Sequence, residues 1–208
     1  CMIQLANSYD EVAVSALESS QLALLLEFAE HTKLEPEWTQ AGETYYWRKV
    51  LEPHRLPNEI QDIFGGSSQH FGECKLDRLG SNSEAARYHL CDSRIPGVSA
   101  RQHSQLEQKW ATLLWHADTY MEYDARKVIV YLTDTDETTG ALAVEKNHRW
   151  AQNNDYRGVC EHYDYVDEIE PTYYGGPAGT VISFSTRLLH RINVPQTGSR
   201  LAFHMLLK

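Results

Sequence analysis

Short apolar segments separated by glycine- and proline-containing turns fill much of the chain after residue 74 and limit its fold more than any other feature. The turns include the stretches DETTG, YGGPAG and NVPQTGS. Segments this short, without long helices alternating between them, favour an antiparallel sandwich or barrel over a parallel α/β sheet. The predicted strands span residues 86–91, 111–117, 127–132, 141–146, 180–186 and 200–207.

The first third of the chain shows a helical pattern instead. A helix is predicted where apolar residues recur on one face, at Leu22, Leu25, Leu26 and Ala29. Ser19 or Ser20 could cap this helix, and Asn58 is placed to cap a second, short one. The aromatic segment 44–51 between them predicts a strand.

The composition indicates which kinds of partner and which cellular compartment to expect. The formal net charge is −10 and no run of Lys or Arg occurs, which disfavours nucleic acid as a ligand. The sequence shows no apolar stretch long enough for a membrane span and no secretory signal. The four cysteines lack a metal-binding CxxC spacing and fit reduced thiols. We therefore expect a cytoplasmic protein with neither nucleic acid nor membrane as a partner, and the oligomeric state stays open.

His116 and Asp118, in the segment LLWHADTY, form the first candidate for chemistry. Residues two apart on a strand face the same way, about 6–7 Å apart, so both could bind one metal ion. Two histidines and one carboxylate suit nonhaem Fe(II). The alternative is a polar strand end, since the same spacing recurs at His162 and Asp164 in an acidic stretch that indicates a solvated loop.

His190 and Arg200 strengthen the metal hypothesis because they follow in a consistent order. His190 is expected to end one apolar strand and Arg200 to open the last one, so both could face the inside of one barrel. An arginine there suits bidentate binding of a carboxylate, and a buried arginine needs an anionic partner. The alternative for Arg200 is a surface salt bridge at the end of a hairpin.

This ordered set resembles the Fe(II)- and 2-oxoglutarate-dependent oxygenases, and within them the phytanoyl-CoA dioxygenase-like family. The resemblance covers about residues 111–207 and rests on HAD, KVIVYL, GALAVEKNH, LLH and Arg200. It implies a mainly β, double-stranded β-helix fold (jelly-roll or cupin-like) with N-terminal helices packed on the outside. We expect a single domain over residues 1–208, with a helical part at about 1–70 and a metal-binding core at about 74–208.

The resemblance also implies the site and the reaction. It implies His116, Asp118 and His190 as catalytic Fe(II) ligands and Arg200 as the partner of the distal carboxylate of 2-oxoglutarate. Tyr131 could also bind 2-oxoglutarate, or it could be a packed tyrosine. With O2, such an enzyme hydroxylates an unactivated C–H bond of a small-molecule or carrier-bound substrate and releases succinate and CO2. Related halogenases have a small residue in place of Asp118, so its presence favours hydroxylation.

Two other functions stay open: a catalytically inactive binding protein with this fold, and an oxygenase acting on a protein side chain. The segment 147–178 shows no strand pattern and is predicted to be a long excursion beside the site. Its aromatic residues could form a lid or lie on the surface. His204 shares the strand face of Arg200 and could lie near the co-substrate or in the core.

Overall fold

The structure of the chain, a computed structural model, describes residues 12–40, 43–65, 71–80, 115, 125–146, 170–193 and 195–207. Ten strands, two α-helices and one 3₁₀ turn make up this part of the chain. In order they are β1 (Val12–Ala16), α1 (Ser19–His31), β2 (Glu35–Gln40), β3 (Glu43–Leu51), η1 (Pro53–Arg55), α2 (Asn58–Ile63), β4 (Phe71–Gly80), β5 (Arg126–Tyr131), β6 (Leu142–Glu145), β7 (Pro171–Tyr174), β8 (Thr180–Ser185), β9 (His190–Ile192) and β10 (Ser199–Leu207).

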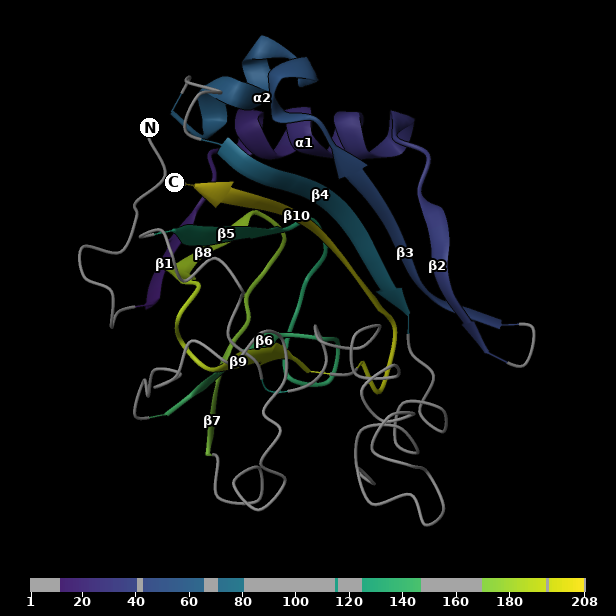
Figure 1. Cartoon of the computed structure of the whole chain (residues 1–208), viewed down its shortest axis with the longest axis vertical. Helices are drawn as coiled ribbons and strands as arrows, with labels where there is room; N and C mark the ends of the chain where they lie inside the picture. Colours follow the sequence, from purple (N-terminus) through teal and green to yellow (C-terminus); the bar gives the residue numbers. More distant parts are fainter. Residues whose placement is uncertain are drawn as a thin grey trace.

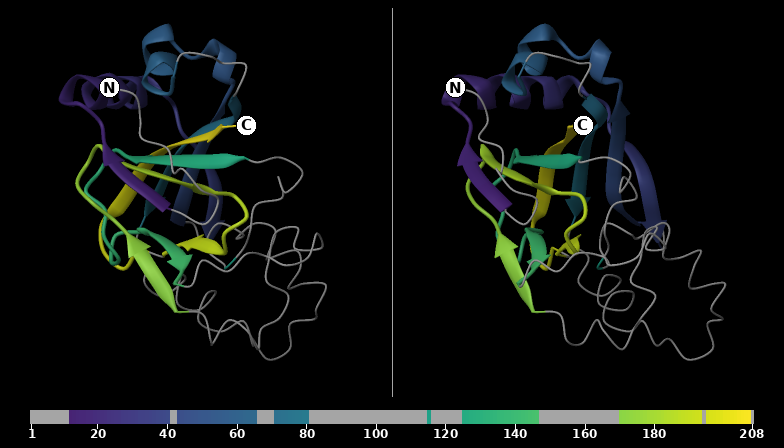
Figure 2. Two further views of the ribbon diagram at one scale, coloured as in Figure 1. Left: turned by 90° about the vertical axis from the view of Figure 1, so that its left-hand side faces the viewer. Right: turned by 60° about the vertical axis from the view of Figure 1, so that its left-hand side comes forward.

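The strands form two antiparallel sheets. The large sheet has the order β1-β8-β5-β10-β4-β3-β2, and the small sheet has the order β7-β6-β9. The helices lie on one side of the large sheet and the small sheet lies on the other, as all the views of Figures 1 and 2 show. The molecule therefore has three layers, and the space between the two sheets is lined from both.

The two faces of the large sheet differ because side chains alternate along each strand. On β10, Phe203 and Met205 belong to the core that packs against the helices. Ala202, one position away, belongs to the core between the two sheets. Arg200 and His204 lie two residues on either side of Ala202, so their side chains are carried into the layer between the sheets.

The predicted helices are present, but their N-termini differ from the prediction. The apolar face of α1 packs on the large sheet as expected, with Leu25 fully buried. Neither Ser19 nor Ser20 caps this helix: its cap is Glu18, whose backbone N–H donates to the Gln21 side chain at 3.0 Å. Asn58 does not cap α2 but is its first residue, after Pro57.

All five predicted strands in the described part of the chain are confirmed, and five further segments are strands: β1, β2, β4, β7 and β9. β5, β6, β8, β10 and β3 match the prediction within a few residues. The N-terminal part was expected to be helical, yet β1 and β2 also lie there, and β1 pairs with β8. β4 was not predicted, and β7 contradicts the expectation that 147–178 holds no strand. Pairing with distant strands stabilises these segments, which no local pattern reports.

Two predicted strands cannot be compared in this way. Residues 86–91, and all of 111–117 except Trp115, lie outside the described residues. Within the described ranges, no helix has the length and apolar character that crossing a membrane requires.

Candidate active site

His190 is a buried histidine on the small sheet. It does not end the preceding strand as expected, because a turn at 186–189 separates it from β8 and it opens β9. Its Nδ1 lies 2.8 Å from the Leu188 carbonyl oxygen, and its ring meets the Phe184 ring edge-on at 4.8 Å between centroids. A donating Nδ1 places the lone pair of a neutral ring on Nε2, which is the tautomer with which histidine binds a metal.

His116 and Asp118 lie outside the described residues, whereas Trp115, the residue before His116, is described. Trp115 is buried and packs with Ala143 and Leu189. The Arg191 guanidinium lies 5.1 Å from the centroid of a Trp115 ring. Trp115 therefore contacts both residues that flank His190 in sequence.

Arg200 is fully buried between the sheets, and its ion-pair partner comes from this same chain. Its Nη2 donates to Oδ1 of Asp77 at 2.8 Å, and neither side chain is exposed to solvent. Among the described residues, Nε and Nη1 of Arg200 have no hydrogen-bond partner. The surface salt bridge considered from the sequence is therefore wrong in its location, because the ion pair is buried.

Asp77, on β4, joins several polar side chains between the sheets, which we call the Asp77 cluster: Tyr46, Lys75, Asp77, Arg200 and His204. Its Oδ2 accepts a hydrogen bond from the Tyr46 hydroxyl at 3.1 Å. Nε2 of His204 lies 3.0 Å from the same oxygen, but its ring N–H is not aligned for a hydrogen bond to it. Nζ of Lys75 lies 3.8 Å from it.

The charges in this cluster follow from burial and from the neighbours. Burial alone raises the pKa of the Asp77 carboxyl, but His204, Arg200 and Lys75 outweigh this effect and hold its pKa below its usual range. Burial lowers the pKa of His204 to about 4, and Asp77 only partly opposes this. Near neutral pH the cluster thus holds an anionic Asp77 paired with the cation Arg200, beside a neutral His204.

Asp77 was not predicted from the sequence. A buried Arg200 was expected to need an anionic partner, but no residue of the chain was named for it. The signal was the alternation in CKLDRLG, where Lys75 and Asp77 fall on one face of a strand whose other face carries Cys74 and Leu76. A carboxylate in such a strand predicts a buried partner.

Tyr131 lies on the inner face of β5, and its hydroxyl links the two sheets. It donates to the Tyr174 carbonyl oxygen at 2.8 Å and accepts from the Leu142 backbone N–H at 2.8 Å. Burial raises its pKa to about 12, so it stays protonated. Since its only proton is engaged with Tyr174, Tyr131 in this arrangement has only a lone pair to offer a ligand. Its binding to 2-oxoglutarate stays a prediction.

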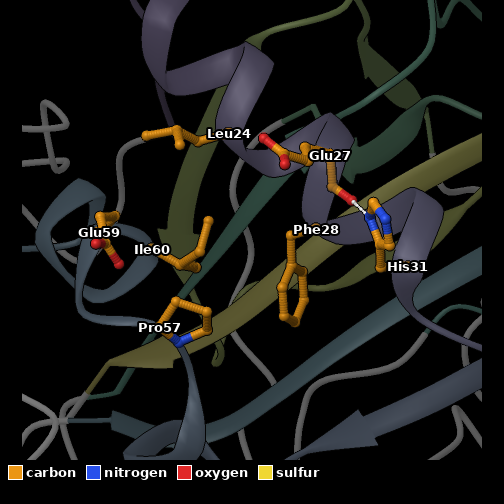
Figure 3. Close-up of a pocket in the computed structure, with 7 residues that line it drawn as sticks. All are labelled: Leu24, Glu27, Phe28, His31, Pro57, Glu59 and Ile60. Carbon is orange, nitrogen blue, oxygen red and sulfur yellow. Dashed lines mark hydrogen bonds between the residues drawn. The ribbon is translucent and has the colours of Figure 1, made fainter.

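A groove of about 320 Å³ lies outside this layer, between α1 and α2. Figure 3 shows its lining, in which Phe28 and Ile60 face the space and His31 turns back to its own helix. Nδ1 of His31 lies 2.8 Å from the Glu27 carbonyl oxygen, so this ring is engaged. The large sheet separates this groove from the Asp77 cluster, which lies on its other face. No group of three possible metal ligands occurs among the residues that the structure describes, which do not include His116 and Asp118.

Comparison with known proteins identifies the type of fold. No protein-family model and no curated protein matches the sequence. Three similar solved structures are the non-heme alpha ketoglutarate dependent epimerase SnoN from nogalamycin biosynthesis (TM-score 0.60, 12% identity, 95% of this chain and 78% of that one), EctD from S. alaskensis with 2-oxoglutarate and 5-hydroxyectoine (0.56, 14%, 95% and 72%), and EvdO2 from Micromonospora carbonacea var. aurantiaca complexed with 2-oxoglutarate (0.56, 11%, 99% and 91%). At these identities the likeness shows the fold alone: a mainly β, double-stranded β-helix, as the sequence predicted.

Proposed function

We propose that the chain is a nonhaem Fe(II)- and 2-oxoglutarate-dependent dioxygenase of the phytanoyl-CoA dioxygenase-like type. It would hydroxylate an unactivated C–H bond of a small-molecule or carrier-bound substrate with release of succinate and CO2. The observation that carries the proposal is Arg200, a fully buried arginine between the two sheets whose Nε and Nη1 have no partner among the described residues. Unpaired buried donors of a cation are costly, and an anionic ligand would satisfy them.

The residues at hand fit a 2-oxoglutarate site. The distal carboxylate would lie against Nε and Nη1 of Arg200, where burial and the low dielectric strengthen a charge-assisted hydrogen bond. Tyr131 would border this site from β5, where its hydroxyl links the two sheets. The contact with 2-oxoglutarate predicted from the sequence would require this hydroxyl to donate to the ligand in place of the Tyr174 carbonyl oxygen.

The same residues fit an iron site. His116, Asp118 and His190 would hold Fe(II), which when bound supplies the oxidation of the substrate by O2. The Nδ1 contact of His190 selects the ring tautomer that a metal requires. The packing of Trp115 between Leu189 and Arg191 supports a ligand set in which the segment after Trp115 and the segment around His190 come together.

Hydroxylation is the outcome that we propose because Asp118 keeps a carboxylate in the ligand set. The similar structures include enzymes with different outcomes, among them the epimerase SnoN and the carbocyclase SnoK. EctD was solved with 5-hydroxyectoine and SnoN with nogalamycin RO, both small molecules. These ligands support a small-molecule substrate over a protein side chain. The buried site that we propose for the co-substrate, at Arg200, argues against a catalytically inactive binding protein with this fold.

The proposal is tested by adding Fe(II) and 2-oxoglutarate under anaerobic conditions. We expect the weak visible charge-transfer band of the bound chelate, and succinate formation once O2 is admitted. Absence of both the band and the succinate would contradict the proposal. Asp118→Ala is expected to lose the iron-dependent activity.

Arg200→Ala supplies the sharper measurement. Because a buried charge-assisted pair is lost, the concentration of 2-oxoglutarate needed for half-maximal binding should rise about 100-fold or more. Arg55→Ala is the matched control, since Arg55 is an exposed arginine paired with Glu52 on η1. An unchanged requirement in Arg200→Ala, with the protein folded, would place the co-substrate elsewhere.

A further inference from the structure

We propose that Asp77 is a positioning residue that presents the guanidinium of Arg200 to the co-substrate carboxylate, and that it thereby sets the preference for a 2-oxo acid with a second carboxylate. This inference rests on the proposed function, because it concerns the same site. It assigns a role to a residue on a distant strand that would not itself touch the ligand.

The contacts of Asp77 divide unequally between its two oxygens. Oδ1 accepts a hydrogen bond from Nη2 of Arg200 at 2.8 Å. On the other oxygen, the Tyr46 hydroxyl donates at 3.1 Å and Nε2 of His204 lies at 3.0 Å. Nζ of Lys75 also approaches this oxygen, at 3.8 Å. One oxygen is therefore directed to Arg200, while the other is held by three neighbours.

This division fixes the orientation of the carboxylate. Asp77 lies opposite Ala202 on the neighbouring strand β10, two residues from Arg200, so the arginine side chain must lean along the strand to reach it. A side chain with four rotatable bonds would otherwise adopt several orientations in the layer between the sheets. With Nη2 held by Asp77, the unpaired Nε and Nη1 present one defined edge to a ligand.

The local charge supports the same conclusion. His204 stays neutral near pH 7 because burial lowers its pKa to about 4, so its ring leaves Asp77 to pair with Arg200. Asp77 lowers the cost of burying Arg200 in the free protein but engages only Nη2 of the guanidinium. Nε and Nη1, which have no partner among the described residues, suit a distal carboxylate, and a 2-oxo acid with an uncharged tail lacks that group.

Asp77→Asn is the variant that tests the proposal, because an amide has one acceptor oxygen where the carboxylate has two. The Tyr46 hydroxyl and the Lys75 ammonium lie on the side of Oδ2, so the amide oxygen should turn toward them and its NH2 toward Arg200. Two donors then face each other, and the guanidinium is displaced. The control is Tyr46→Phe, which removes a donor to Asp77 but keeps its ion pair with Arg200.

Calorimetry with Mn(II) in place of iron, without O2, measures binding without turnover. Two probes are compared: 2-oxoglutarate, and 2-oxovalerate, which lacks the distal carboxylate. In Asp77→Asn we expect affinity for 2-oxoglutarate to fall about ten-fold or more while that for 2-oxovalerate stays within about two-fold. Tyr46→Phe should keep wild-type affinity for both.

Each other outcome has a defined meaning. If both probes weaken equally in Asp77→Asn, or if 2-oxoglutarate binds as well as before or more tightly, the positioning role is wrong and the proposed function stands. If the wild-type protein with Mn(II) does not bind 2-oxoglutarate, the proposed function fails and this inference fails with it. Asp77→Ser, which leaves room for water, replaces Asp77→Asn should that variant not fold. Failure of both variants to fold would assign Asp77 to stability alone and overturn the proposal.

Discussion

At the scale of single residues, His204 should make the stability of the protein depend on pH. Its pKa is lowered from 6.5 to about 4 by burial beside Lys75 and Arg200, with Asp77 partly opposing this. Between these two values the unfolded chain binds a proton that the folded chain does not. The free energy of unfolding should therefore be full above pH 6.5 and should fall as the pH drops toward 4, by about 3 kcal/mol in total.

Urea unfolding at a series of pH values measures this dependence. His204→Gln should show a shallower slope between pH 6.5 and 4, because a glutamine does not titrate and is of similar size. The matched control is His31→Gln, which changes an exposed histidine on α1. The pKa of Asp77 is held below its usual value of 3.8, so loss of its ion pairs contributes only at still lower pH. A wild-type slope in His204→Gln would contradict the assignment.

At the scale of elements, the turn between β5 and β6 supports the position of Arg200. Gly140 has φ +110°, a conformation that side chains disfavour, and a Cβ there would lie 3.1 Å from Cγ of Pro195 and 3.4 Å from Cβ of Arg200. Gly140→Ala should therefore lower the free energy of unfolding by about 1–3 kcal/mol. It should also weaken 2-oxoglutarate binding, because the added methyl group presses on the Arg200 stem.

Gly65→Ala separates these two effects. Gly65 has a similar φ, +99°, but a Cβ there would meet no atom within 4 Å. Denaturant unfolding of both variants should show a smaller loss for Gly65→Ala, with unchanged binding of 2-oxoglutarate. Equal losses in the two variants would mean that the backbone conformation alone matters at Gly140.

At the scale of the whole molecule, Tyr131 holds the large and small sheets together. Tyr131→Phe removes the donor to the Tyr174 carbonyl and leaves the Leu142 backbone N–H without its acceptor, both in the core between the sheets. We expect the free energy of unfolding to fall by about 2–4 kcal/mol, since an unsatisfied buried N–H adds to the lost hydrogen bond. Thermal or urea unfolding measures this loss.

Tyr174→Phe is the control for this variant, because only the carbonyl oxygen of Tyr174 accepts the bond from Tyr131. It should keep most of the stability. Binding of 2-oxoglutarate to folded Tyr131→Phe then tests the sequence-based prediction that Tyr131 contacts the co-substrate. Weaker binding would support that contact. Unchanged affinity would mean that Tyr131 links the two sheets but does not contact the co-substrate.

Local sequence patterns were sufficient to predict much of the fold and the shared strand face of Arg200 and His204. The period-two alternation of β10 placed Arg200 and His204 on one face, and the structure confirms that both are buried on it. The turns predicted before β6, β8 and β10 are also confirmed, because each of these strands begins at or just after the point where its turn signal ends. The predicted roles of His116, Asp118 and His190 as iron ligands remain proposals.

Other features could not be predicted because distant segments create them. β1 is a strand because it pairs with β8, and β4 because it lies between β10 and β3. The partner of Arg200 is Asp77, 123 residues earlier in the chain. The sequence indicates that a buried arginine needs an anionic partner. Which residue supplies that partner depends on which strands become neighbours in the sheet.

The sequence by itself determined the class of fold and the chemical types available to the site, since strand period, turns and side-chain chemistry are local properties. The tertiary structure alone decided which groups meet: Arg200 with Asp77, and Tyr131 with two backbone groups of the small sheet. Electrostatic and hydrogen-bond energies depend on distance and on exclusion of water, and both arise only when the two sheets close on each other.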